Sequence, residues 1–213
     1  MHSSSRILYG FSQGPPDEIE GRRLKIDVCY CGDPGMANDV VRPLRALKPQ
    51  DDSVGVRSYL EAQAAGGFLQ APVAHFQTNL ILPELSGPAI AAITTAVSEA
   101  PARCKLIIVP LRGAASRVNL SDMAYALRQP GFEIDMAGVW SAPSEKAEVV
   151  RWVNAARDTL LPFAHGVYVN QLGDTSDQLV RTAYGPNCAR LVEIKKTYDP
   201  HNVLRLNQNI EPT

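Results

Sequence analysis

The chain has 213 residues, of which 45% are hydrophobic and 20% are charged, and its formal net charge is −1. This is the composition of a globular protein with a substantial core, and the scattered Lys and Arg residues exclude a basic nucleic-acid-binding surface. No apolar run approaches the roughly 20 residues of a membrane span and no secretory leader is recognisable, so we expect a cytoplasmic protein without membrane contact.

The four cysteines do not have the spacing of a metal site. Cys29 and Cys31 form a C-x-C pair, but Cys104 and Cys188 stand alone in the sequence. Because a structural zinc site needs four ligands in recognisable pairs, we predict reduced thiols and no metal.

Three elements are predicted in the first third of the chain. The stretch RRLKIDVCYC (residues 22–31) alternates between apolar and polar side chains, which is typical of a half-buried strand. Residues 36–48 have apolar side chains at helical spacing, with Pro43 inside the pattern. SYLEAQAAGG (residues 58–67) is predicted as a short helix that ends at two glycines.

Strands and helices alternate through the middle of the chain. The predicted strands are VAHFQTNLIL (73–82), CKLIIVPL (104–111) and GFEIDMAGVWSA (131–142). Ser86 is expected to cap a helix over residues 86–100, with Ile90, Ile93 and Val97 on its apolar stripe. RGAASRV (112–118) is predicted as a turn into another short strand.

The last third is predicted to be mainly helical. A helix over residues 144–162 begins at Ser144 and ends at Pro162, and GVYVN (166–170) is predicted as a brief strand. Two short helices follow, over residues 177–185 and 187–198. Leu191, Ile194 and Tyr198 are expected to be the buried stripe of the last helix, which Pro200 ends.

This order predicts an α+β fold, with an antiparallel or mixed sheet, helices packed on one face and the other face open. The strand sides away from the helices have polar residues, namely Asp27, His75, Gln77, Asn79, Glu133 and Asp135. Two interpretations stay open, because such a face can simply contact water, or its neutral amides and imidazole can form a wall for a polar ligand or another domain.

No motif of independent catalysis accompanies this face. The sequence has no G-x-S-x-G, H-E-x-x-H, C-x-x-C or P-loop pattern and no G-x-G-x-x-G. Composition and periodicity therefore indicate a fold without indicating a reaction.

The C-terminal third resembles a known family through many positions at fixed spacing. The matched residues are Tyr168, Asn170, Tyr184, Gly185, Arg190, Leu191, Lys195, Tyr198, Asp199, Pro200, Asn202, Arg205, Asn207, Ile210 and Pro212, with Leu204 at a usual Phe position. The pattern is similar to the end of the berberine-bridge-enzyme-like FAD-linked oxidases. Weaker similarity to their substrate domain covers residues 30–47, 111–118 and 123–140.

The resemblance implies three regions. They are an N-terminal extension (1–21), a substrate-domain-like α+β sheet (22–162) and a C-terminal berberine-bridge-enzyme-like segment (163–213). In this family a larger N-terminal part binds FAD, and we find no counterpart of it in the sequence. We therefore expect FAD as the family's cofactor, held by a separate flavin-binding part, and an isolated chain that is inactive.

The resemblance also implies a set of site residues. Tyr168 is the expected base, with Asp122 as the only acid near the place where some family members have a carboxylate base. The resemblance further implies that Asn170, Arg128, Asn207 and Gln208 face flavin or substrate. His75, Gln77 and Asn79 join this set from the polar face of their strand.

Three functions stay open at this point. The first is the substrate-binding half of a flavin oxidoreductase that acts on a small organic molecule, with a separate FAD-binding polypeptide as partner. The second is a non-catalytic module that binds a partner or self-associates through the open sheet face. The third is a cofactor-free enzyme that uses Tyr168, His75 and an acid for proton transfer.

Overall fold

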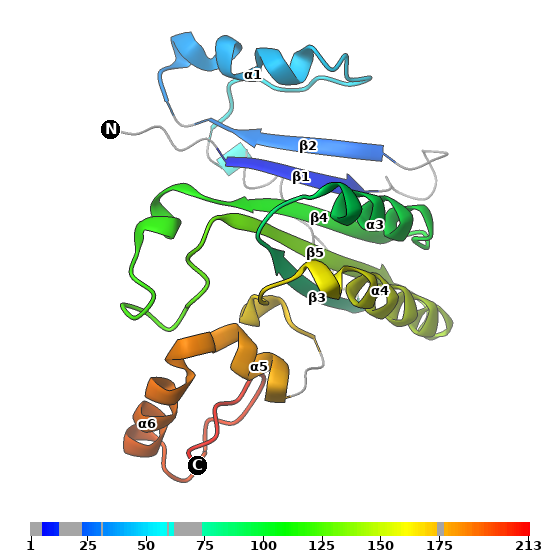
Figure 1. Cartoon of the computed structure of the whole chain (residues 1–213). Helices are drawn as coiled ribbons and strands as arrows, with labels where there is room; N and C mark the ends of the chain where they lie inside the picture. Colours follow the sequence, from blue (N-terminus) through cyan, green and yellow to red (C-terminus); the bar gives the residue numbers. More distant parts are fainter. Residues whose placement is uncertain (1–5, 13–22, 31, 59, 62–73, 174–176) are drawn as a thin grey trace.

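The computed structural model describes residues 6–12, 23–30, 32–58, 60–61, 74–173 and 177–213. Its centre is a five-stranded sheet in the order β2-β1-β4-β5-β3 (Figure 1). The strands are β1 (Arg6–Ser12), β2 (Arg23–Cys29), β3 (Ala74–Leu82), β4 (Cys104–Leu111) and β5 (Gly131–Trp140), and every pairing is antiparallel. The stretch expected as an N-terminal extension supplies β1, which joins β2 to β4.

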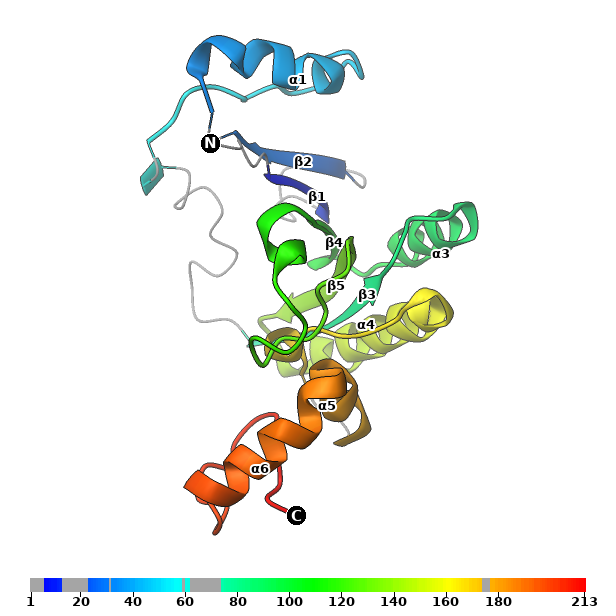
Figure 2. The same cartoon turned by 60° about the vertical axis from the view of Figure 1, so that its left-hand side comes forward.

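The helices are α1 (Ala37–Arg45), α3 (Gly87–Ser98), α4 (Lys146–Leu160), α5 (Asp177–Tyr184) and α6 (Cys188–Tyr198). α3 and α4 lie side by side on one face of the sheet, while α5 and α6 lie beyond the β3 edge (Figures 1 and 2). The predicted α+β class with helices on one face is confirmed. None of the helices in the described part of the chain is long and apolar enough to cross a membrane.

The core lies between the central strands and α3 and α4. Alternate residues of β3, β4 and β5 point into it, and Leu80, Leu106 and Met136 are almost fully buried there. Because a sheet residue and its second neighbour share a face, this alternation fixes which strand sides the helices cover. The Trp152 indole Nε1 of α4 donates a hydrogen bond of 2.9 Å to the Ala96 carbonyl of α3, which fixes the two helices to each other.

Gly138 allows α4 to approach the sheet closely. A Cβ atom built at this position would lie 2.6 Å from both Cys104 Sγ and a methyl carbon of Val149. The small residue is therefore required by packing in the middle of a strand, where glycine otherwise weakens the ladder.

The sequence patterns predicted where the helices lie in the chain better than they predicted which residues of each helix are buried. In α3 the buried residues are Ala89, Ile93 and Ala96, whereas Ile90 is 51% exposed. In α6 the expected buried stripe is wrong, because Ile194 and Tyr198 are 43% and 83% exposed. The periodicity located both helices, but it did not show that α6 lies away from the main core.

Two predicted strands are wrong. Residues Gly113–Arg117 form a 3-10 turn instead of leading into a strand. In the GVYVN stretch only Gly166 makes a β-bridge, to Ile81, and residues Val169–Gln171 turn as a 3-10 helix. The β-branched residues of GVYVN favour an extended chain. The segment turns instead, because the Asn79 side chain hydrogen-bonds the backbone of Tyr168.

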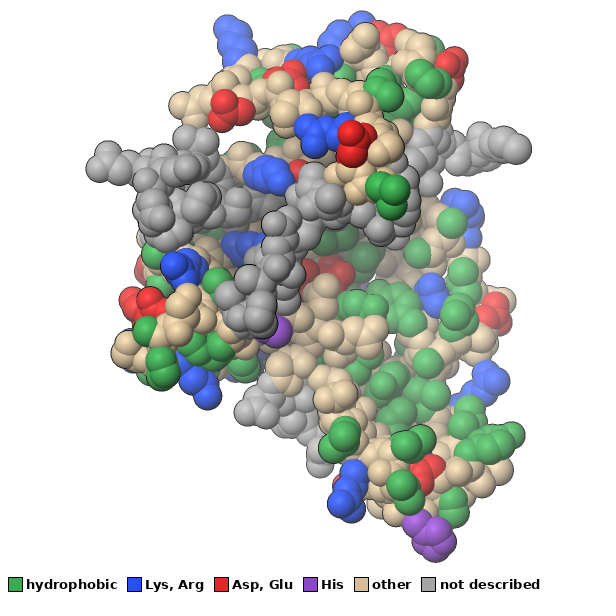
Figure 3. Space-filling model, turned by 180° about the vertical axis from the view of Figure 1, so that it is seen from behind, with side chains coloured by type: hydrophobic (Ala, Val, Ile, Leu, Met, Phe, Trp, Pro, Cys, Tyr) green, Lys and Arg blue, Asp and Glu red, His purple; other side chains and the backbone are tan. Residues whose placement is uncertain are grey.

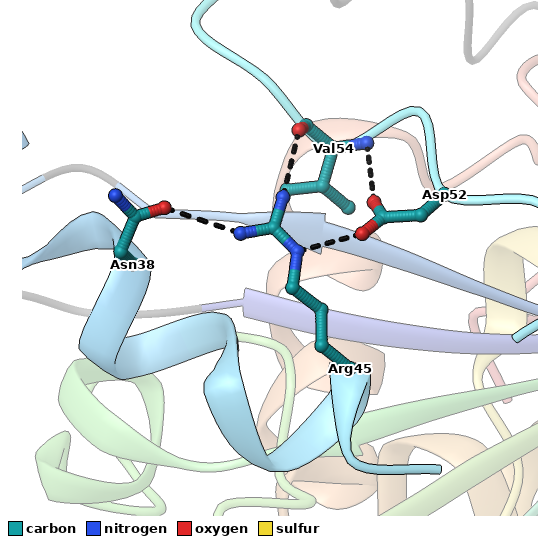
Figure 4. Close-up of polar contacts among 4 residues, drawn as sticks. All are labelled: Asn38, Arg45, Asp52 and Val54. Carbon is teal, nitrogen blue, oxygen red and sulfur yellow. Dashed lines mark hydrogen bonds and ion pairs between the residues drawn. The ribbon is translucent and has the colours of Figure 1, made fainter. Parts of the chain in front are cut away.

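The N-terminal helix α1 lies beyond β2, apart from the core helices (Figures 1 and 2), and continues through Pro43. Its Arg45 guanidinium ties down the chain that follows: it donates to Asp52 at 2.6 Å, to Asn38 at 3.1 Å and to the Val54 carbonyl at 3.2 Å (Figure 4). Of the short helix predicted over residues 58–67, residues 60–61 are helical and most of the rest lies outside the described residues.

Candidate functional site

The segment 165–173 is bound along the outer edge of β3. The His165 N–H donates to the Ile81 carbonyl at 2.9 Å, and the Ile81 N–H donates to the Gly166 carbonyl at 2.8 Å. At the other end of the segment, the Gly173 N–H donates to the Gln77 carbonyl at 3.0 Å. These bonds cover a strand edge that would otherwise be exposed, and they position the Tyr168–Asn170 motif beside the sheet.

Asn79 fixes the backbone of this segment. Its side-chain amide donates to the Tyr168 carbonyl at 2.7 Å, and its amide oxygen accepts from the Tyr168 N–H at 2.6 Å. The side chain is fully buried, so both polar ends have their partners inside the protein. Asn79 was expected to face a ligand, but its side chain instead holds the backbone of Tyr168 in place.

A cavity of about 390 Å³ opens where β3, the 165–173 segment and the C-terminal tail meet. Its lining contains five of the residues expected to face flavin or substrate: His75, Gln77, Asn170, Asn207 and Gln208. Phe76, Leu172 and Gly173 complete the wall. Residues more than 130 positions apart in the sequence thus meet in one place. Four of the eight lining residues have neutral amide side chains, which both donate and accept hydrogen bonds.

The C-terminal tail is held against the body by short polar contacts. The Gln208 amide donates to the Leu172 carbonyl at 2.8 Å. Asp199 accepts from the Val203 and Leu204 N–H groups at 2.7 and 3.0 Å and forms a 2.6 Å ion pair with Lys195. The hydrogen bond from Lys195 and those from the backbone lower the pKa of Asp199 to about 2. The Tyr-Asp-Pro sequence therefore ends α6 and also fixes the turn that leads to Asn207 and Gln208.

Tyr168 lies between the cavity and a second tyrosine. Its hydroxyl accepts a hydrogen bond of 2.8 Å from the Asn170 amide, so the phenol's own hydrogen is not used in that bond. Its ring meets Tyr125 edge to face, with 5.7 Å between the centroids. Arg128 stacks on Tyr125 at 4.9 Å and donates to the carbonyls of Tyr125 and Ala115. Arg128 thus holds the loop that carries Tyr125.

Asp122, the other expected catalytic residue, does not line the cavity. It is exposed on a loop that faces α6, where Asn187 donates to the carbonyls of Leu120 and Met123, and Arg190 donates to that of Ser121. Among the described residues, Tyr168 contacts Asn79, Asn170 and Tyr125, and no hydrogen bond joins it to Asp122.

The sequence reasoning did not include Glu133 and Asp135 among the site residues. Both point to the face away from α3 and α4, as predicted, but they are only 7% and 8% exposed. The Gln171 amide lies over them and, in the orientation that satisfies its hydrogen bonds, donates to Asp135 Oδ2 at 2.8 Å and Glu133 Oε1 at 3.1 Å. Figure 3 shows acidic side chains near the centre of this face. The alternation of acids in a strand was the available signal, but alternation does not reveal burial.

Burial shifts the pKa values of the titratable side chains on this face of the sheet. Desolvation raises the pKa of Glu133 to about 7, and desolvation together with the Glu133 charge raises that of Asp135 to about 8. Across the ladder, burial lowers the pKa of Lys105 to about 8. Two carboxyl groups and an amine that can change protonation near neutral pH thus share one sheet face.

The chemistry of the cavity lining suits a neutral, hydrogen-bonding group better than a phosphate. Its amides can donate to and accept from N–H and C=O groups such as those of a flavin's pyrimidine edge, while its lining contains no Lys or Arg for a diphosphate. Among the described residues, no three His, Cys, Asp or Glu side chains are grouped so that they could hold a metal ion, and Cys31 lies outside that part.

Comparison with known proteins finds a family resemblance in the C-terminal part of the chain. The model of the family "Berberine and berberine like" matches residues 167–211. The uncharacterized FAD-linked oxidoreductase YgaK of Bacillus subtilis is 32% identical over 93% of this chain and 41% of its own length. (R)-6-hydroxynicotine oxidase of Paenarthrobacter nicotinovorans is 30% identical, over 91% of this chain and 45% of its own length.

This chain resembles the C-terminal part of the berberine-bridge-enzyme-like FAD-linked oxidases. Solved structures agree in fold: berberine bridge enzyme from Eschscholzia californica superimposes with a TM-score of 0.78 at 17% identity, over 99% of this chain and 49% of the enzyme. A berberine-bridge-enzyme-like protein of Arabidopsis thaliana gives a TM-score of 0.77 at 18% identity, over 98% and 50%. The chain spans about half the length of these relatives, and the predicted resemblance is confirmed.

Proposed function

We propose that this chain is the substrate-side part of an FAD-linked oxidoreductase that oxidises a small organic molecule. The sheet face opposite α3 and α4 covers the flavin ring, and the substrate binds between them. The observation that supports this most is the cavity, where five residues expected to face flavin or substrate meet although they come from separate segments. An FAD-linked relative that matches over 93% of the chain supports the reaction class.

Bound FAD would accept the hydride, and the chain's own residues bind, orient and move protons. Gln77, Asn170, Asn207 and Gln208 hydrogen-bond the polar edge of the ring or substrate from the cavity wall. Tyr168, aligned by Asn79 and Asn170, presents its hydroxyl beside them. Tyr125 and Arg128 limit the site on the opposite side.

We further propose that the groups that bind the rest of FAD lie on another part of the assembly, either a separate polypeptide or a longer form of this one, in the cytoplasm. The tail has a surface for such a contact. Val203, Leu204 and Leu206 are 75%, 77% and 86% exposed, and Tyr198 is 83% exposed. Apolar side chains gathered in one segment favour burial against a partner.

The visible spectrum tests this function. The polypeptide or complex that contains these residues is purified from its native host through a C-terminal tag, and absorbance is recorded before and after anaerobic addition of candidate substrates. We expect a flavin band that comigrates with the chain on gel filtration and bleaches with a substrate. A native preparation without flavin contradicts the proposal.

The exposed apolar residues of the tail also favour a second function, a module that self-associates through this surface. Sedimentation velocity distinguishes self-association from the flavin-dependent function. A concentration-dependent dimer that Leu204→Ser and Leu206→Ser dissociate supports self-association. A monodisperse monomer at all concentrations rules it out.

A further inference from the structure

Lys105 is a partly buried cation on the open face of the sheet. On the same strand, β4, the residues Cys104, Leu106 and Ile108 belong to the core that α3 and α4 cover. Because strand residues alternate between the two faces, the Lys105 side chain leaves β4 on the face opposite these helices. Partial burial of a cation is costly unless an opposite charge or hydrogen bonds compensate for the lost hydration.

The strand register places Lys105 in line with the cavity. Lys105 pairs with Ala137 of β5, and Ala137 pairs with Gln77 of β3, which lines the cavity. Neighbouring strands lie about 4.8 Å apart, so β3 and β4 are roughly 10 Å apart along this row. Ala137 is buried and has only a methyl group, so no long side chain of β5 starts between Lys105 and Gln77. A ligand with one ring and a short chain is long enough to contact both side chains.

The charged groups around Lys105 leave this part of the face positive at mildly acidic pH. Lys25 and Asp27 of β2 form an ion pair of 2.9 Å, so their charges offset each other. Glu133 and Asp135 of β5, with pKa values raised to about 7 and about 8, are mainly protonated at about pH 6. Burial, together with repulsion from Lys25, lowers the pKa of Lys105 to about 8, so its amine is still mainly charged at that pH. A partly buried amine of this kind on a ligand-facing surface is typical of a binding group.

We propose that Lys105 binds an anionic group of the substrate, and that the substrate is therefore a small organic acid. The substrate carboxylate lies at the Lys105 amine, and the end that is oxidised lies toward Gln77 and the cavity. A charge-assisted hydrogen bond from the ammonium group fixes this orientation. The amides of the cavity are neutral and do not supply such a charge. The orientation rests on the proposed function, whereas the anion site itself does not require flavin.

Calorimetric titration of the natively purified protein with benzoate and with benzamide tests the anion site. The two probes have nearly the same shape, but only benzoate is charged. We expect benzoate to bind about tenfold more tightly or better, because a hydrogen bond to a charged group is the stronger one. Lys105→Met should abolish this preference and leave benzamide binding unchanged, whereas Lys105→Arg should retain the preference. Lys25→Met is the matched control, since Lys25 is an exposed lysine on the same face. It should change benzoate affinity by less than about twofold.

The pH dependence of benzoate binding separates the charge of Lys105 from a structural role. Between about pH 6.5 and about pH 9 the affinity should fall by about tenfold or more, because Lys105 loses its proton while Glu133 and Asp135 become negative. Lys105→Arg stays charged throughout this range, so its affinity should fall less. His75 of β3 lies on the same face and is common to both proteins, so its effect cancels in the comparison.

Equal binding of benzoate and benzamide by the wild type overturns the anion site, and so does a preference for benzoate that survives Lys105→Met. Absence of any benzoate binding, or an identical pH dependence in the wild type and Lys105→Arg, overturns it as well. A native preparation without flavin contradicts the proposed function instead, and the benzoate titration of that preparation still decides whether Lys105 binds an anion.

Discussion

At the scale of single residues, the site depends on polar groups that are satisfied inside the protein. Asn79 is fully buried, yet its amide makes two short bonds to the Tyr168 backbone, at 2.7 and 2.6 Å. A buried polar group whose hydrogen bonds are all satisfied favours one conformation of the segment that it binds. Glu133 and Asp135 are also buried, at 7% and 8% exposure, but they share one donor. The bonds of Asn79 involve no group that titrates, whereas the arrangement of Glu133 and Asp135 depends on pH.

Replacing Asn79 by Ala should destabilise the protein by about 2–4 kcal/mol, since two hydrogen bonds are lost and the Tyr168 N–H and C=O are left unpaired. The measurement is urea unfolding followed by fluorescence. Gln77→Ala is the matched control, because Gln77 lies on the same side of the same strand and is only half-buried. Equal effects of the two substitutions would contradict the structural role of Asn79.

Stability should fall as pH rises from about 4 to about 8. The folded-state pKa values of Glu133 and Asp135, about 7 and about 8, exceed the ordinary values of about 4 in the unfolded chain. In this window the folded state binds more protons, so each rise in pH favours unfolding. Urea midpoints at about pH 5 and about pH 8 should differ more for the wild type than for Glu133→Gln.

His165 acts in the opposite direction in the same window, because burial lowers its pKa and its stabilising contribution grows as pH rises. This contribution is common to wild type and variant, so it cancels in the comparison. An identical pH dependence in both proteins would show that Glu133 ionises normally.

At the scale of elements, the sequence largely predicted where strands and helices lie in the chain. It did not predict which of their side chains are buried or which distant segments they contact. The strands of residues 73–82, 104–111 and 131–142 and the helix capped by Ser86 follow from alternation and capping, which are local properties. The bend at Val169–Gln171 depends on Asn79, some 90 positions earlier. The exposure of Tyr198 and the burial of Glu133 also depend on contacts between segments, which no local pattern contains.

The turn after α6 should depend on Asp199. Asp199→Asn removes the ion pair with Lys195 and weakens the acceptor of the Val203 and Leu204 N–H groups. We expect proteolytic cleavage within residues 200–213 to become faster, while cleavage elsewhere stays the same. The same cleavage should accelerate in the wild type as pH falls toward about 2, because the lowered pKa of Asp199 makes its contribution disappear only there.

Glu193→Gln provides the control, because the Glu193–Lys196 pair is exposed on the same helix. Exposed pairs of this kind contribute little. If both variants were cleaved at the wild-type rate, the tail would be held by other contacts.

At the scale of the whole molecule, the two faces of the sheet have different roles. α3 and α4 close one face with an apolar core (Figure 1). The other face presents amides, tyrosines and a carboxyl pair, and the C-terminal tail forms the side of its cavity. We propose that the second face contacts flavin and substrate, and the similarity of this chain to about half of the longer oxidases supports that proposal.

Hydrogen–deuterium exchange of the natively purified protein, with FAD bound and with FAD removed, tests this assignment most directly. The account predicts that FAD slows exchange in residues 74–82, 168–173 and 205–211, which line or adjoin the cavity, and leaves α3 and α4 unchanged. Protection confined to the α3 and α4 side, or no protection in these segments, would contradict it.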